Sequence, residues 1–131
     1  DIPVDSLPGP SSILPALTLS GLPPDKFMFL GYPPEKPGHR LKWLEGVKLI
    51  HLEGGLRWHP TIIMFAAPHK LIKTLADIKE VFGDIEIVLA KELTKIHQSV
   101  KSKKISEWLE ELENPKGEYV LLLSIRPKTF I

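Results

Sequence analysis

The sequence contains no cysteine, and this absence excludes disulfide bonds, cysteine-ligated zinc and thiol catalysis. It has no apolar run near the roughly 18 residues that a membrane-spanning helix needs. The 17 basic side chains nearly cancel the 16 acidic ones, so neither a polybasic tail nor an acidic disordered segment is present. Because no basic-then-apolar leader is visible either, we expect a cytoplasmic protein without a membrane partner.

Several catalytic signatures are also missing. The sequence has no Gly-x-Ser-x-Gly, no Walker loop and no Gly-x-Gly-x-x-Gly, so the residues do not support serine-hydrolase or phosphate-loop chemistry. Its five histidines are not spaced as metal ligands usually are, and we expect no metal site. They are His39, His51, His59, His69 and His97.

The chain has 131 residues, 43% of them hydrophobic, which suits one domain that buries about two-thirds of its unfolded surface. Nine of its 13 prolines fall before residue 38. The run from Pro8 to Ser12 excludes regular structure, because two prolines lack an N–H donor and Gly9 permits unusual dihedral angles. Ser11 or Ser12 can then cap a short helix that ends near Gly21.

Apolar runs and helical spacing predict the remaining elements. Four apolar runs bounded by Gly, Pro or charged residues predict strands at 27–30, 61–65, 85–90 and 119–125. Helical periodicity predicts helices at 38–52, 68–82 and 105–112. The segment 91–104 carries five lysines and one glutamate and is predicted as a basic loop. The alternation of strands and helices predicts an α/β domain around a central sheet.

Two loops are candidate ligand sites, because ligands of open α/β sheets bind beyond the carboxyl ends of strands. The loop at 66–70 begins with two alanines, which let a ligand approach the backbone, although Pro68 also suits a simple helix start. The loop at 91–97 is polar and cationic, but its spacing alone favours a solvated connection over a ligand site, because charge runs usually face water.

Five short motifs occur in order along the chain: PGPSS at 8–12, SGLPPDKF at 20–27, PHKL at 68–71, AKELTKIH at 90–97 and KGE at 116–118. Together they resemble the tetrapyrrole methylase superfamily, whose members are S-adenosylmethionine-dependent enzymes. Within it, the ELTKxH and PHKL segments are similar to the branch that methylates a cytidine ribose 2′-hydroxyl in 16S ribosomal RNA. The resemblance extends from about residue 2 to residue 125.

The resemblance implies a division of the chain. Members of the superfamily have two α/β domains with the cofactor between them, and they commonly form homodimers. Residues 1–24 resemble the end of the amino-terminal domain and the interdomain junction, and residues 25–131 the carboxyl-terminal domain, a mixed sheet of about four to five strands flanked by helices. The glycine-rich strand-loop of the amino-terminal domain is missing here. We therefore expect a piece of a longer methyltransferase that is inactive alone.

The resemblance also implies roles for particular residues. The positions that match the cofactor contacts of the family are Ser11, Ser12, Phe65, Ala66, Ala90 and Lys95. A ribose hydroxyl benefits from a general base, and the candidates by motif are Glu92, Lys95 and His97. The cations that could meet RNA phosphates are Lys26, Lys36, Arg40, Lys101, Lys103 and Lys104.

Some positions depart from the branch. Many members have Glu-Ser where this chain has Ala66 and Ala67, and His-Glu-Glu where it has His97, Gln98 and Ser99. These departures leave two alternatives open beside the ribosomal-RNA enzyme. One is a methylase of a corrin or porphyrin precursor, and the other is a non-enzymatic domain that binds RNA or dimerises.

Overall fold

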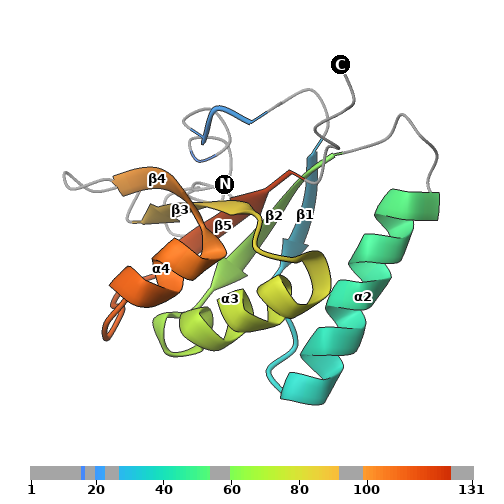
Figure 1. Cartoon of the computed structure of the whole chain (residues 1–131), viewed down its shortest axis with the longest axis horizontal. Helices are drawn as coiled ribbons and strands as arrows, with labels where there is room; N and C mark the ends of the chain where they lie inside the picture. The colour runs from blue at the N-terminus through green and yellow to red at the C-terminus, as the bar shows by residue number, and fades with distance from the viewer. Residues whose placement is uncertain (1–15, 17–19, 23–26, 54–59, 92–98, 125–131) are drawn as a thin grey trace, which may run out of the picture.

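A computed structural model of the chain describes residues 16, 20–22, 27–53, 60–91 and 99–124. Within these ranges it is an α/β structure with a mixed five-stranded sheet in the order β1-β2-β5-β3-β4 (Figure 1). The elements are β1 (Phe27–Gly31), α2 (Pro37–Glu53), β2 (Thr61–Ala66), α3 (Pro68–Phe82), β3 (Glu86–Lys91), β4 (Ser99–Lys104), α4 (Ile105–Glu111) and β5 (Tyr119–Leu123).

The strand directions bring several strand ends to one edge of the sheet. β1 is parallel to β2, whereas β5 is antiparallel to both β2 and β3. The first residue of β5, Tyr119, pairs with Ala66 at the end of β2 and with Lys91 at the end of β3. The carboxyl ends of β1, β2 and β3 therefore lie at the same end of the sheet, which is the end where β5 begins.

The two faces of the sheet are packed differently. One face carries α2, α3 and α4 (Figure 1), and side chains such as Leu44, Leu75 and Trp108 pack there against Met64 and Leu121 of the strands. On the other face, a smaller buried cluster joins the strands to Ala16. Its members are Ala16, Ile63, Val88, Ala90, Val120 and Leu122.

Helix α3 forms as its sequence predicts. Leu71, Leu75 and Ile78 recur at helical spacing and are fully buried against the sheet. Pro68 occupies the start of the helix, where its missing N–H donor has no cost. Gly83 follows the last turn with φ 89°, a conformation that favours glycine, and its N–H donates to the carbonyl of Lys79.

Two strand assignments differ from the sequence prediction. The segment predicted as a basic loop contains β4, whose backbone pairs with β3 from Ser99 to Lys104. The periodicity missed β4 because it is an edge strand, which needs few apolar side chains, and its lysines suit an exposed edge. β1 was predicted from its apolar run, which is typical of a buried strand, but Phe27 and Phe29 are 44% and 42% exposed, since β1 is the edge strand on the other side of the sheet. The predicted short helix after Ser12 lies mostly outside the described residues.

A buried ion pair joins the loop after β1 to the two long helices. Arg40 of α2 is only 2% exposed, and its Nε donates to Asp77 of α3. Its Nη1 donates to the carbonyl oxygens of Glu35, at 3.1 Å, and of Pro34, at 3.4 Å. A buried guanidinium is tolerated only when such partners compensate for its lost hydration. Arg40 therefore fixes where the loop 32–36 lies.

No helix in the described part of the chain is long and apolar enough to cross a membrane. Within the same residues, no group of three or more histidine, aspartate or glutamate side chains could hold a metal ion.

Removing Asp77 should destabilise the protein strongly. Asp77→Ala leaves the Arg40 guanidinium buried without its carboxylate, and we expect the free energy of unfolding to fall by about 3 kcal/mol. Urea denaturation followed by circular dichroism measures this. Glu80→Ala removes an exposed carboxylate from the same helix and should change stability by less than about 0.5 kcal/mol. Equal effects of the two substitutions would contradict the structural role of the pair.

The indole of Trp108 should stabilise the fold through its hydrogen bond as well as through its buried apolar surface. Nε1 of Trp108 donates to the carbonyl oxygen of Ile87 at 2.9 Å and so ties α4 to β3. Trp108→Phe keeps an aromatic ring but loses this donor, and we expect a stability loss of about 1–3 kcal/mol in urea denaturation. The exposed Glu110→Gln substitution is the matched control, and a Trp108→Phe protein as stable as this control would refute the expectation.

Candidate functional site

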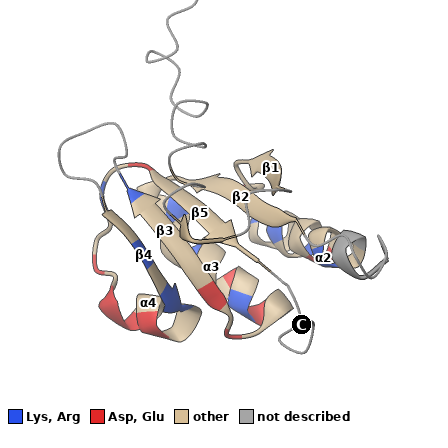
Figure 2. Cartoon of the chain, turned by 90° about the horizontal axis from the view of Figure 1, so that it is seen from above, with Lys and Arg blue, Asp and Glu red and all other residues tan. Residues whose placement is uncertain are grey.

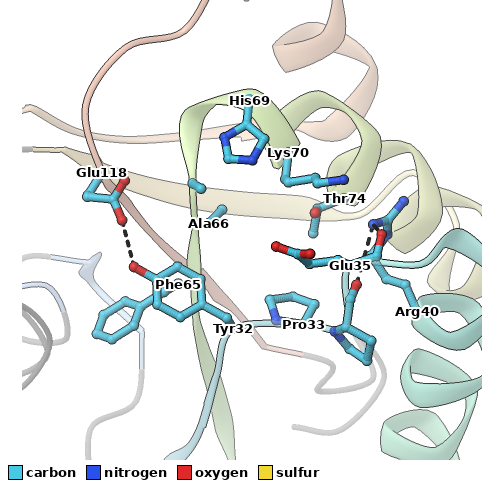
Figure 3. Close-up of a pocket in the computed structure, with 12 residues that line it drawn as sticks. Tyr32, Pro33, Glu35, Arg40, Phe65, Ala66, His69, Lys70, Thr74 and Glu118 are labelled. Carbon is cyan, nitrogen blue, oxygen red and sulfur yellow. Dashed lines mark hydrogen bonds between the residues drawn. The ribbon is translucent and has the colours of Figure 1, made fainter.

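A cavity of about 230 Å³ lies at this end of the sheet, beyond the carboxyl ends of β1 and β2 (Figure 3). The loop after β1 supplies one wall, the end of β2 with the start of α3 another, and the residue before β5 a third. The lining residues are Tyr32, Pro33, Pro34, Glu35, Arg40, Phe65, Ala66, Ala67, His69, Lys70, Thr74 and Glu118. The direction of the strands thus gathers residues that are distant in the sequence.

Aromatic rings form the apolar wall of the cavity. The ring of Phe65 lies 5.3 Å from the ring of Tyr32, centroid to centroid. Behind it, the exposed Phe29 of β1 contacts Phe65 edge-on at 5.0 Å. This packing fixes the Phe65 ring and leaves Tyr32 largely open to solvent.

A short hydrogen bond holds the Tyr32 side chain. Its hydroxyl donates to Oε1 of Glu118 at 2.6 Å, across the mouth of the cavity (Figure 3). This bond to Glu118, with smaller contributions from burial and from the carboxylate charge, raises the pKa of Tyr32 to about 12. Near neutral pH, Tyr32 is therefore a hydrogen-bond donor and not a base.

The polar groups of the cavity are distributed unevenly. Arg40 is committed to Asp77 and to backbone carbonyls, which leaves Lys70 as the remaining cation among the lining residues. Two carboxylates, Glu35 and Glu118, lie at its rim, and Figure 3 shows the Glu35 side chain extending into the cavity. Because Arg40 and Asp77 neutralise each other, the charged groups left in the lining are two negative carboxylates and one positive ammonium.

Thr74 forms part of the floor. It lies on α3 one turn after Lys70 and is 2% exposed. Its hydroxyl makes no hydrogen bond within the ranges that the structure describes. A buried hydroxyl without a partner has a free-energy cost, which a bound polar group would remove.

The structure places some of the residues expected to contact the cofactor. Phe65 and Ala66 line the cavity. Ala90 lies fully buried in β3, in the cluster on the face opposite the helices. The other expected positions, Ser11, Ser12 and Lys95, lie outside the described residues, as do the candidate bases Glu92 and His97.

The cations expected to meet RNA do not gather in one place. Lys36 is exposed just before α2, whereas Lys101 and Lys104 are exposed on β4, at the far end of the sheet (Figure 2). Lys103 is paired with Glu111, whose pKa this bond lowers, and lies 5.1 Å from the Trp108 ring centroid.

The remaining expected cations are Arg40 and Lys26. Arg40 is buried in its ion pair rather than on the surface, because the loop 32–36 and α3 both need its donors. Lys26 is outside the described residues.

Six lining residues were not singled out as site residues from the sequence: Tyr32, Pro33, Pro34, Glu35, Thr74 and Glu118. Tyr32 and Glu35 follow the first predicted strand. Because ligands of open α/β sheets bind beyond the carboxyl ends of strands, this position could have identified both residues as candidates. Glu118 belongs to the KGE motif directly before β5. Thr74 gave no signal, because a threonine at an apolar helix position looks like an ordinary core residue.

Comparison with known proteins gives a consistent result, although no protein-family model matches the chain. It is 37% identical over 125 residues to ribosomal RNA small subunit methyltransferase I of Thermotoga maritima, covering 94% of this chain and 52% of that protein. The protein of the same name from Rickettsia prowazekii is 43% identical over 123 residues, or 92% of this chain and 41% of the relative. The chain thus spans about half, or less, of the length of these relatives.

A solved structure shows the same fold. The crystal structure of the methyltransferase CobJ superposes with a TM-score of 0.51 at 17% identity, over 84% of this chain and 46% of CobJ. That identity supports a likeness of fold only. The chain therefore resembles the tetrapyrrole methylase superfamily and is similar, over more than nine-tenths of its length, to about half of ribosomal RNA small subunit methyltransferase I.

Proposed function

We propose that the chain is part of an S-adenosylmethionine-dependent methyltransferase that methylates small-subunit ribosomal RNA, at a ribose 2′-hydroxyl. The observation that carries the proposal is the identity of 37% to 43% over more than nine-tenths of the chain to proteins with that name. The cavity at the strand ends supports it, because this is where open α/β sheets bind ligands. The same relatives favour an RNA substrate over a corrin or porphyrin precursor and over a non-enzymatic role.

In this proposal the chain is the second half of the enzyme. Residues 1–24 would form the junction with an amino-terminal domain, and residues 25–131 the carboxyl-terminal domain. The cofactor would lie between the two domains, so the piece would be inactive alone. The relatives exceed this chain in length by roughly the size of a further domain, which supports the division. Pairing as a cytoplasmic homodimer is part of the same proposal.

The strand ends suit the cofactor. Phe65 offers a half-buried apolar ring, and Ala66 and Ala67 leave the backbone accessible to an adenine edge. S-adenosylmethionine, when bound, supplies a methyl group on a sulfonium, an activated leaving group that needs no metal. Ser11, Ser12, Ala90 and Lys95 would complete the contacts.

The chain's own residues would chiefly orient the substrate. Methyl transfer from sulfur to oxygen is an in-line displacement, in which proximity and alignment supply much of the rate. Tyr32 is not the base, because its phenol remains protonated up to about pH 12. Glu92, Lys95 or His97 would accept the proton of the ribose hydroxyl. Lys36, Lys101 and Lys104 would contact phosphates at separate points.

The central test uses the chain together with the sequence that precedes it in its reading frame. We expect this longer protein to bind S-adenosylmethionine in calorimetry and to transfer a radiolabelled methyl group to 16S RNA. Residues 1–131 alone should bind the cofactor at least about tenfold more weakly, since half of the cleft is then absent. A longer protein that binds the cofactor but labels no small-subunit RNA would refute the substrate assignment.

The raised pKa of Tyr32 gives a second test. Glu118→Gln removes the charged acceptor, and the pKa of Tyr32 should fall from about 12 towards its ordinary value of 10.0. The raised value also means that the stabilisation from this bond is complete below pH 10 and is lost as the pH rises towards 12. Tyrosinate absorbance measures the titration, and Glu113→Gln on the same connection is the control. An unchanged titration in Glu118→Gln would show that the bond is absent in solution.

A further inference from the structure

We propose that Arg40 and Asp77 are positioning residues of the cofactor site, which set the affinity for S-adenosylmethionine by holding the loop 32–36 in the conformation that the ligand needs. That the cavity binds this cofactor rests on the proposed function. The positioning role rests on the contacts of the loop itself.

The chain leaves β1 in a way that gives the loop no regular partner. The register of β1 with β2 shifts between Phe29 and Gly31. Gly31 has φ 73°, a left-handed conformation that favours glycine and ends the regular strand. Pro33 and Pro34 then lack the N–H donors with which a loop could pair to a neighbouring backbone. The loop therefore depends on side chains for its position.

Two side-chain anchors hold the loop, one at each end (Figure 3). At its start, the Tyr32 hydroxyl donates to Glu118, but Tyr32 is 55% exposed, and water can compete for such a bond. Near its other end, Nη1 of Arg40 donates to the carbonyl oxygens of Pro34 and Glu35. Arg40 is buried, so water does not compete there. Arg40 is therefore the stronger of the two anchors.

Asp77 determines where the Arg40 guanidinium points. Its carboxylate accepts a hydrogen bond from Nε, and because the guanidinium is planar and rigid, this bond also fixes the direction of Nη1 towards the loop. Asp77 lies on α3, whose first two turns carry Lys70 and Thr74 of the cavity lining. The ion pair therefore sets the separation between the loop wall and the α3 wall of the cavity.

The loop in turn carries side chains that meet a ligand in the cavity. Tyr32 and Glu35 both line it, and Figure 3 shows Glu35 extending into the cavity. Arg40 also lines the cavity, but its Nε and Nη1 are already bonded to protein atoms, and the lining does not include Asp77. A ligand that meets an ordered loop loses no free energy in ordering it, so a held loop raises the affinity. Because one of the bonded carbonyls belongs to Glu35 itself, the pair acts on the ligand chiefly through this side chain.

Calorimetry with the longer protein tests this role, with S-adenosylhomocysteine as the probe. Arg40→Lys keeps a charge beside Asp77 but lacks the planar fork that reaches the carboxylate and the loop carbonyls at once. Asp77→Asn keeps the size of the side chain but loses the charge that orients Arg40. We expect each substitution to weaken binding about tenfold, as for the loss of a preorganised wall. Unchanged affinity in both variants would overturn the proposal.

Two controls separate positioning from general stability, at a temperature where circular dichroism shows every variant to be folded. Lys42→Ala changes an exposed cation on the same helix and should leave the affinity unchanged. Trp108→Phe destabilises the fold at α4 rather than at the loop, and should also leave the affinity unchanged. A Trp108→Phe protein that loses as much affinity as Arg40→Lys would show that stability alone is involved, and the positioning role would be wrong.

A double-substitution cycle tests whether Arg40 acts through the loop. Glu35→Ala removes the loop side chain that extends into the cavity and should itself weaken binding, so a displaced loop should then matter less. We expect Arg40→Lys to weaken binding by less than about threefold in the Glu35→Ala protein, against about tenfold in the unmodified one. Equal factors in the two backgrounds would mean that the two residues act independently, which contradicts the proposal.

Relaxation of ¹⁵N nuclei in residues 1–131 tests the anchoring without any cofactor. In the unmodified chain the amides of Tyr32 and Glu35 should have order parameters of about 0.85, and in Arg40→Lys they should fall below about 0.6. Trp108→Phe should leave them unchanged. Order parameters that stay high in Arg40→Lys would show that Arg40 does not anchor the loop.

The outcomes separate this inference from the proposed function. If the unmodified longer protein binds no S-adenosylhomocysteine, the cofactor assignment is wrong, and with it the ligand named here. If it binds this probe with the same affinity as the Arg40→Lys and Asp77→Asn proteins do, the proposed function stands and only the positioning role falls.

Discussion

The pairing of β5 with both β2 and β3 is the constraint on which the rest of the structure depends. β5 comes last in the described chain, yet it occupies the centre of the sheet, and all five of its residues are buried. Until it is in place, the β1–β2 pair and the β3–β4 pair have no backbone contact with each other. Its first residue, Tyr119, pairs with the ends of both neighbours, so the same pairing that completes the core also assembles the candidate site.

A second interaction gives the site its shape. The loop after β1 contains Pro33 and Pro34 and has no ladder of its own to hold it. Arg40 holds the loop in place instead, because it donates hydrogen bonds to two carbonyl oxygens of the loop. Asp77 balances the charge of Arg40. A guanidinium suits this task because its several donors lie in one rigid plane. The cavity is therefore bounded by backbone that α2 and α3 hold in position together.

The sequence predicted most of the fold, for physical reasons. α3 has a strong apolar periodicity with Pro68 at its start and Gly83 at its end, and both of its boundaries were predicted correctly. β2 and β5 are short buried runs of branched residues and were also found. β4 was missed, since Ser, Val and Lys alternate there without an apolar face and only its pairing with β3 makes it a strand. Propensity cannot report a strand that is stabilised chiefly by its neighbour.

The site was less predictable than the fold. Phe65 and Ala66 were expected at a ligand edge because they end a buried strand, and they do line the cavity. No local pattern could show that Tyr32 and Glu118, which are 86 positions apart, share a hydrogen bond. Nor could charge alone reveal that Arg40 faces inwards. Such relations depend on the strand order, which β5 sets from a distance.

The two edge strands of the described sheet, β1 and β4, carry different kinds of side chains. β4 carries Lys101, Lys103 and Lys104, charges that oppose the approach of another strand. β1 carries the exposed rings of Phe27 and Phe29 and no charge at all between residues 27 and 31. A further strand, from this chain or another, can therefore pair with the described sheet on one side only. The lysines of β4 oppose such pairing, whereas the uncharged, aromatic β1 permits it.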